Sequence, residues 1–125
     1  MSGLRDFEKL LGDIINLSDS VRFVFVTNEE GRVVHSRISS KAFMLGKDQV
    51  SVLGVDLQIL RKILRLYDDL IGQSTSLHMV REKVHVLVFY VGQWTVLVSC
   101  DRDAERHKLA DLSFEIEAVL GKTLK

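Results

Sequence analysis

The chain lacks proline entirely and contains a single cysteine among its 125 residues. Without proline, turns must be built from glycine, asparagine, aspartate and serine. Cys100 has no second cysteine with which to form an internal disulfide, so nothing in the sequence indicates an oxidising compartment. Net charge is also absent, because 17 basic residues balance 17 acidic ones. A chain without a positive field is not expected to bind nucleic acid.

Long apolar segments are missing as well. A membrane-spanning helix needs about 20 apolar residues, whereas the longest run here, 84–91, contains His85 and has the length of a strand. The N-terminal segment carries acidic residues between its apolar positions, unlike a secretory signal. We therefore expect a cytoplasmic protein with no membrane insertion. Its length predicts a single domain over residues 1–125.

The spacing of apolar residues predicts eight elements in the order α-β-β-α-β-β-β-α. Three- and four-residue spacing predicts helices at 4–15, at 48–72 with Asp48 as N-cap, and from 101–103 to Gly121. Runs of β-branched and aromatic residues predict strands at 21–27, 32–38, 75–80, 84–91 and 94–100.

Two of the predicted strands indicate how the elements are layered. Strands 84–91 and 94–100 are apolar on both faces, whereas a sheet with one wet face would alternate apolar and polar residues. Both faces should therefore be covered by helices. The short connections around these strands allow only antiparallel hairpins. The predicted fold is an α+β three-layer sandwich, with a five-stranded antiparallel sheet between helices on both faces.

The predicted middle helix carries more apolar surface than one sheet contact needs. One stripe consists of Leu53, Leu57, Leu60, Leu64, Tyr67 and Ile71. A second stripe, about 100° around the helix, consists of Val52, Ile59, Ile63, Leu66 and Leu70. We assign the first stripe to the sheet and the second to a partner, because an exposed apolar patch usually marks an interaction surface. Alternatively, Phe43, Met44 and Leu45 of the loop at 39–47 fold over it.

The histidines are the only candidates for a metal site. If Arg81 and Glu82 form a two-residue turn, His78 and His85 lie opposite each other across a hairpin and could share a metal. No third ligand has a recognisable spacing, and a histidine in an apolar strand is more commonly a hydrogen-bonded structural residue. We therefore expect no metal.

No other combination of residues indicates catalysis. Cys100 ends an apolar strand and has no histidine at a useful spacing, so we interpret it as a core residue. The carboxylate pairs 29–30, 68–69 and 101/103 fit a turn, a polar helix face and a helix N-terminus. The basic cluster Arg61, Lys62 and Arg65 fits a solvated face. Phosphate-binding glycine motifs are absent. We expect neither enzymatic activity nor a cofactor.

The order of elements and two segments resemble the Roadblock/dynein light-chain family. The segment VRFVFVTNEEGRVVHSR is similar to the family's first hairpin, and WTVLVSCDRDAERHKLADLSFEIEAVL is similar to its last strand, acidic turn and closing helix. The resemblance covers residues 4–120. It implies a Roadblock-like, or profilin-like, domain that forms a homodimer through the middle helix and the third strand, with one sheet continuing across both subunits.

The resemblance also implies a function. Members of this family bind Ras-like small GTPases as regulators or scaffolds. The predicted dimer interface joins the second helical stripe to the third strand and comprises Val52, Ile59, Ile63, Leu66, Leu70, Thr75, Leu77 and Met79. The alternative function is a profilin-like or PAS-like domain that senses a small molecule, with Phe43, Met44 and Leu45 lining its pocket.

Overall fold

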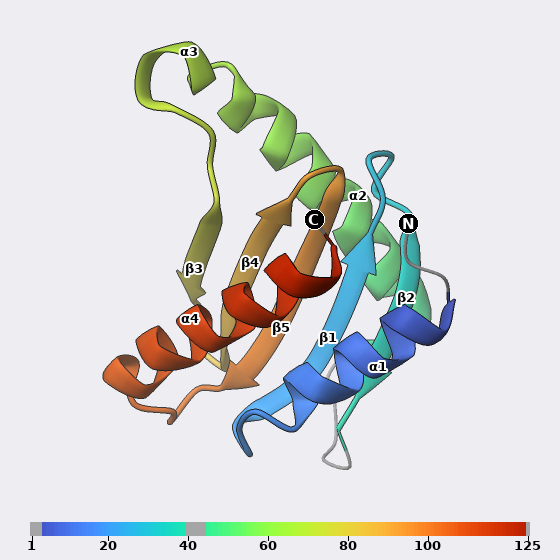
Figure 1. Ribbon diagram of the computed structural model, residues 1–125, viewed down its shortest axis with the longest axis vertical. Coiled ribbons are helices and arrows are strands. Elements are labelled where there is room, and N and C mark those ends of the chain that lie inside the picture. The colour runs from blue at the N-terminus through green and yellow to red at the C-terminus, as the bar shows by residue number, and fades with distance from the viewer. Residues whose placement is uncertain (1–3, 40–44, 125) are drawn as a thin grey trace.

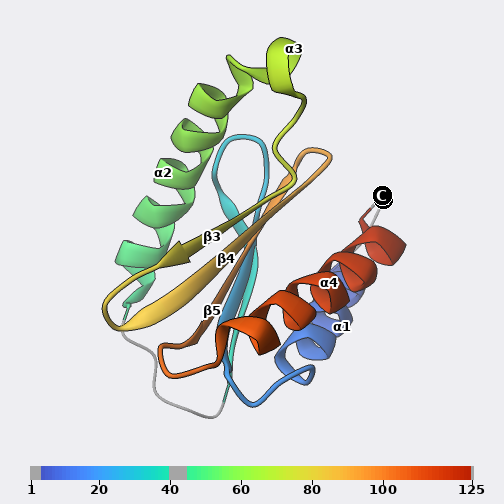
Figure 2. The same cartoon turned by 90° about the vertical axis from the view of Figure 1, so that its left-hand side faces the viewer.

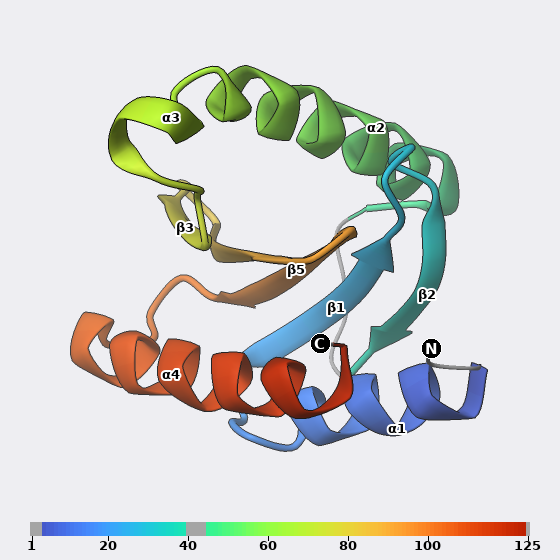
Figure 3. The same cartoon turned by 45° about the horizontal axis from the view of Figure 1, so that its top comes forward.

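The computed structural model describes residues 4–39 and 45–124. It contains the following helices and strands: α1 (Leu4–Ile15), β1 (Val21–Thr27), β2 (Val33–Ile38), α2 (Lys47–Arg65), α3 (Asp68–Ile71), β3 (Ser76–Val80), β4 (Val84–Val91), β5 (Trp94–Asp101) and α4 (Arg106–Thr123). The five strands form one antiparallel sheet in the order β2-β1-β5-β4-β3 (Figure 1). Helices α1 and α4 cover one face and α2 covers the other (Figure 3). The predicted three-layer α+β sandwich is confirmed.

The period-2 pattern of the central strands explains why the sheet carries helices on both sides. In β4, Leu87 and Phe89 belong to the apolar cluster under α1 and α4, whereas Val86 and Val88 belong to the cluster under α2. Successive side chains of a strand point to opposite faces, so a strand that is apolar throughout contributes to two cores. Figure 2 shows the two helical layers on either side of the sheet.

The hairpin between β1 and β2 is fixed by Asn28 and Gly31. The Asn28 side-chain oxygen accepts hydrogen bonds from the backbone N–H groups of Glu30 and Arg32, each at 3.0 Å. Gly31 has a φ of +82°, which a side chain would disfavour. The tip of this hairpin packs closely against Gly54 of α2. A Cβ atom added to Gly54 would lie 2.6 Å from the Gly31 carbonyl oxygen. The sequence indicated the turn but not this contact.

The predicted middle helix is divided, which corrects three expectations. Helix α2 begins after Gly46, whose N–H donates to the Gln49 side chain at 2.9 Å, so Asp48 is not the N-cap. The helix ends at Arg65, and a turn separates it from the short α3. Gly72, with φ +83°, ends α3 rather than one long helix. Since the axis is interrupted, the periodicity of α2 does not extend to Tyr67 and Ile71.

The last helix also differs from its predicted bounds. It begins after Glu105 and continues through Gly121 to Thr123. The segment 101–103 therefore does not open the helix. Instead, Asp101 pairs with Arg22 of β1. Residues 40–44, including Phe43 and Met44, lie outside the described residues.

Candidate interaction surface

The outward face of α2 carries the second apolar stripe. Leu57 is buried against the sheet, and Leu53 and Leu64 pack partly against the same cluster. On the other side of α2, the exposed fractions are 60% for Val52, 52% for Ile59 and 51% for Ile63. Leu66 and Leu70, predicted to continue this stripe, lie beyond the end of α2, in the turn and in α3, and are 76% and 82% exposed. The predicted placement of Leu53, Leu57 and Leu64 against the sheet is thus confirmed. Leu60, assigned to the sheet with them, is half-buried and does not belong to this cluster. Tyr67 and Ile71, assigned to the same stripe, are exposed because the helix breaks before them.

Strand β3 lies at one edge of the sheet with β4 as its neighbour. Leu77 and Met79 pack partly against the cluster under α2, and Thr75 precedes the strand and is exposed. The Thr75 carbonyl accepts a hydrogen bond from the Tyr90 N–H at 2.9 Å. No second strand covers the outer edge of β3 among the described residues, so its backbone groups can pair with another chain. Leu77 and Met79 therefore lie on the sheet face that α2 covers, whereas Val52, Ile59 and Ile63 are exposed on α2 itself.

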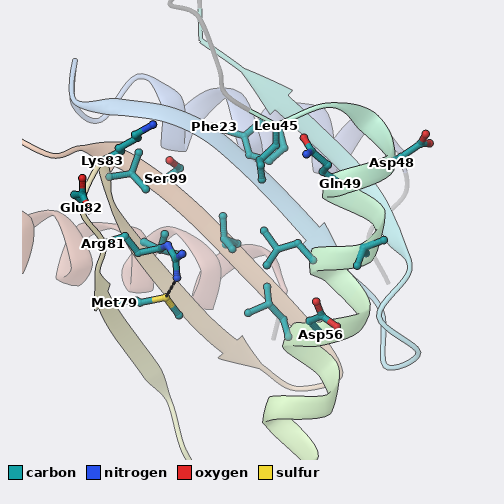
Figure 4. Close-up of a pocket in the computed structure, with 16 residues that line it drawn as sticks. Phe23, Leu45, Asp48, Gln49, Asp56, Met79, Arg81, Glu82, Lys83 and Ser99 are labelled. Atoms are coloured by element: carbon teal, nitrogen blue, oxygen red, sulfur yellow. Dashed lines mark hydrogen bonds between the residues drawn. The ribbon is translucent and has the colours of Figure 1, made fainter.

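A groove separates the N-terminal half of α2 from the β3–β4 hairpin (Figure 4). It has a volume of about 810 Å³ and an apolar floor that includes Phe23, Leu57 and Leu97. Asp48 and Asp56 lie along its α2 side, while Arg81 and Lys83 lie on the hairpin side (Figure 4). Leu45, one of the loop residues expected to cover an apolar surface or line a pocket, lines this groove.

Arg61 is not part of a solvated basic face, as the sequence led us to expect. Its side chain is buried on the sheet side of α2, and its guanidinium lies 4.7 Å from the centre of the Tyr90 ring. It donates hydrogen bonds to the carbonyls of Gly92 at 2.5 Å and Trp94 at 3.1 Å, and to the Thr95 hydroxyl at 3.2 Å. Burial and then the nearby charge of Arg65 lower the pKa of Arg61. Arg61 therefore attaches α2 to the β4–β5 turn.

The two histidines meet, but not in the predicted register. The hairpin turn is shifted by one residue, so His85 pairs with Val80 and His78 pairs with Leu87. The rings nevertheless touch diagonally, with His78 Nε2 3.0 Å from His85 Nδ1. His85 is fully buried and its Nε2 lies 3.1 Å from the Arg102 carbonyl, which makes this nitrogen the donor. This arrangement is that of a hydrogen-bonded structural histidine.

The remaining candidates for chemistry have structural roles. Burial, followed by the charge of Asp101, raises the pKa of the Cys100 thiol to about 12. A fully buried thiol with such a pKa is not a nucleophile at neutral pH. No group of three potential metal ligands occurs within residues 4–39 and 45–124. In the same part of the chain, no helix is long and apolar enough to cross a membrane.

The buried positions of Gly54 and Arg61 were not predicted from the sequence, although both follow from helical spacing. Residues 54, 57, 58 and 61 are the buried positions of α2, so both residues lie on the face that carries Leu57. Gly54 lies three residues before Leu57 and Arg61 lies four residues after it, and this spacing could have identified both as residues of the buried face. The partners of Arg61 could not have been found this way, because they lie on the β4–β5 hairpin.

No family model and no curated protein matches this sequence. Its fold matches solved structures at low sequence identity. The gliding protein MglB from Thermus thermophilus is 12% identical, with a TM-score of 0.78 over 98% of this chain and 93% of that one. An MglB structure with a tetrameric arrangement is 14% identical, with a TM-score of 0.76 over 98% and 93%. A Roadblock/LC7 domain from Streptomyces avermitilis is 13% identical, with a TM-score of 0.72 over 91% of both chains. The chain therefore has the fold of Roadblock/LC7 domains and of MglB.

Proposed function

We propose that this chain is a homodimeric protein-interaction module that regulates or scaffolds a Ras-like small GTPase. The observations that carry the proposal are the exposed apolar side chains of Val52, Ile59 and Ile63 on α2 and the open outer edge of β3. Burying one large aliphatic side chain stabilises an interface by about 1.5–3 kcal/mol, and about half of this remains available where a side chain is half-exposed. A symmetric contact uses each residue twice.

A second copy is the partner that fits both features together. Two α2 stripes can pack against each other while two β3 edges pair in one continuous sheet. Such a contact buries the apolar side chains and pairs the backbone hydrogen-bonding groups of β3 at the same time. The tetrameric arrangement of MglB, a protein of the same fold, supports self-association. The family resemblance of the sequence supports a Ras-like GTPase as the further partner.

The dimer is tested with Ile63→Asp, which places two carboxylates near the two-fold axis in an apolar setting. Because an unpaired buried charge is costly, we expect sedimentation at matched concentration to show a wild-type dimer and a monomeric or aggregated variant. Lys62→Asp is the matched control, since Lys62 is exposed and lies outside the stripe. A wild type that sediments as a monomer of 14.2 kDa contradicts the proposal. A dimer that survives Ile63→Asp shows that another surface pairs.

The GTPase is tested separately, with Ras-like GTPases from the same genome in both nucleotide states. We expect at least one to bind with a dissociation constant in the tens of micromolar or tighter, about −6 kcal/mol. If no GTPase binds in either nucleotide state, the proposed GTPase partner is wrong, and the proposed dimer is unaffected.

The purified chain should not hydrolyse nucleotides or esters, because the described residues include no nucleophile with a neighbouring base. Turnover that is lost in a Cys100→Ser or His85→Gln variant contradicts this expectation.

The groove favours a second candidate function, a profilin-like or PAS-like domain that senses a small molecule. Its volume of about 810 Å³ lies in the range of small-molecule sites, about 300–1,000 Å³. Its apolar floor with charged groups at the rim is also typical of such sites. Native mass spectrometry separates the two functions. A ligand-free dimer supports the interaction module, whereas a monomer with additional bound mass supports the sensor.

A further inference from the structure

The groove between α2 and the β3–β4 hairpin has one buried polar side chain on its apolar floor. Ser99 of β5 lines this groove and is only 4% exposed. Its cross-strand neighbours, Phe23 of β1 and Val86 of β4, line the groove as well, so Ser99 lies on the sheet face below α2. The Ser99 hydroxyl makes no hydrogen bond to the described residues. Buried hydroxyls are rarely left without a partner, and each exception calls for an explanation.

Two cations lie on the same side of the groove as Ser99. Arg81 and Lys83 belong to the β3–β4 hairpin, and Figure 4 shows both on the side where the Ser99 hydroxyl lies. The Arg81 guanidinium has the neutral sulfur of Met79 as a neighbour at 3.7 Å, and neither cation belongs to an ion pair among the described residues. Glu82 lies between them in the sequence and lines the groove too, so this side carries one net positive charge.

The rest of the groove is mainly apolar. Its floor and walls include the side chains of Phe23, Val52, Leu53, Leu57, Val86 and Leu97. The two carboxylates of α2 that line the groove, those of Asp48 and Asp56, are exposed and lie on the opposite side from Ser99 (Figure 4). The groove therefore combines an apolar body with one polar side, which has a buried hydroxyl and a small excess of positive charge.

We infer that the groove binds a free amphiphile with one carboxylate, of the fatty-acid type. The carboxylate accepts a hydrogen bond from the Ser99 hydroxyl and faces Arg81 and Lys83, while the aliphatic tail lies over Leu57 and Leu97. An alcohol would leave the two cations without an anion, and an amphiphilic amine would place a like charge beside them. A phosphate dianion would exceed the single net positive charge on this side. The inference rests on the second candidate function, the small-molecule site, and names the class of its ligand.

Sodium octanoate, used below its micelle concentration, is the probe, followed by the amide chemical shifts of Leu97 and Ser99. At equal concentration and ionic strength, 1-octanol and octylammonium chloride present the same tail with an uncharged or a cationic head, and sodium hexanoate shortens the tail by two methylenes. Ser99→Ala removes the hydroxyl, and Lys83→Met removes one cation. The matched control is Lys108→Met, because Lys108 is also exposed but lies on α4, on the other face of the sheet (Figure 3).

We expect saturable shifts with octanoate and weaker binding of 1-octanol and octylammonium. Ser99→Ala should remain folded, because its hydroxyl has no partner to lose among the described residues. It should bind octanoate about tenfold more weakly, the effect of one hydrogen bond to a charged group. Lys83→Met should bind about threefold more weakly, since an exposed charge contributes little, whereas Lys108→Met should bind like the wild type. Hexanoate should bind about fifteenfold more weakly than octanoate, because each buried methylene contributes a factor of about four.

Two kinds of result overturn the inference, and they differ in what they mean for the groove. In the first, 1-octanol or octylammonium binds as tightly as octanoate, or either Ser99→Ala or Lys83→Met binds octanoate like the wild type. The groove is then a small-molecule site that does not recognise a carboxylate in this way. In the second, none of the amphiphiles gives saturable shifts, and the second candidate function is wrong together with the inference. Neither result affects the proposed dimer or its GTPase partner.

Discussion

Replacing Gly54 by alanine sets two effects of opposite sign against each other. In a helix interior, glycine to alanine ordinarily stabilises by about 1 kcal/mol. At position 54, however, the new Cβ would lie 2.6 Å from the Gly31 carbonyl oxygen and 3.3 Å from methyl groups of Thr27 and Val33. The oxygen belongs to the backbone of a closed turn and cannot rotate away. Overpacking of this kind costs about 1–3 kcal/mol, and a backbone contact belongs at the upper end.

The net expectation for Gly54→Ala is a loss of about 2 kcal/mol in the free energy of unfolding, or about 8 °C in Tm for a chain of this size. Gly121→Ala is the matched control, because Gly121 also lies inside a helix but a Cβ there meets nothing within 4 Å. This variant should be more stable by about 0.5–1 kcal/mol. Urea denaturation followed by Trp94 fluorescence, at a fixed protein concentration, measures both.

The sign of the Gly54→Ala change decides whether the hairpin contact exists. A variant that is stabilised as much as Gly121→Ala would show that α2 does not approach the β1–β2 hairpin as closely as described. A destabilised Gly121→Ala would instead show that helix propensity is the wrong reference for this chain. The two variants therefore separate the contact from the intrinsic preference of the residue.

Two further predictions concern titratable groups. Because the pKa of Cys100 is raised to about 12 by burial, iodoacetamide near pH 8 should label it only in denaturant, and labelling of the folded protein would contradict its placement. Burial, then the charges of His85 and Arg106, lower the pKa of His78, so the folded state favours its neutral form. The contribution of His78 to the free energy of unfolding should therefore be fully present above its unfolded pKa of about 6.5. It should be lost as the pH falls through the lower pKa of His78 in the folded state. His78→Gln should flatten this dependence of urea unfolding, whereas a variant at the exposed His107 should retain it.

Local periodicity determined the architecture. The strands 84–91 and 94–100 carry apolar residues on both faces, interrupted by His85, Thr95 and Ser99, and this predominance requires two covering layers whatever their connections. In the same way, helical spacing separated Leu57 from Ile59 and Ile63, and the structure buries the first and exposes the other two. Such patterns depend only on the geometry of one element, so the sequence contains all the information needed.

Contacts between distant segments had to come from the tertiary structure. The sequence places Arg61 beside Lys62 and Arg65, and only the approach of the β4–β5 turn shows that one of the three is buried. The meeting of His78 and His85 depended on the hairpin turn, since a shift of one residue changes every cross-strand pair. The end of α2 at Arg65 was equally hidden, because the apolar spacing continues past it. The periodicity of a helix or strand determines which face of the element a residue lies on. Long-range packing determines which distant residue it contacts, and no local sequence pattern encodes that contact.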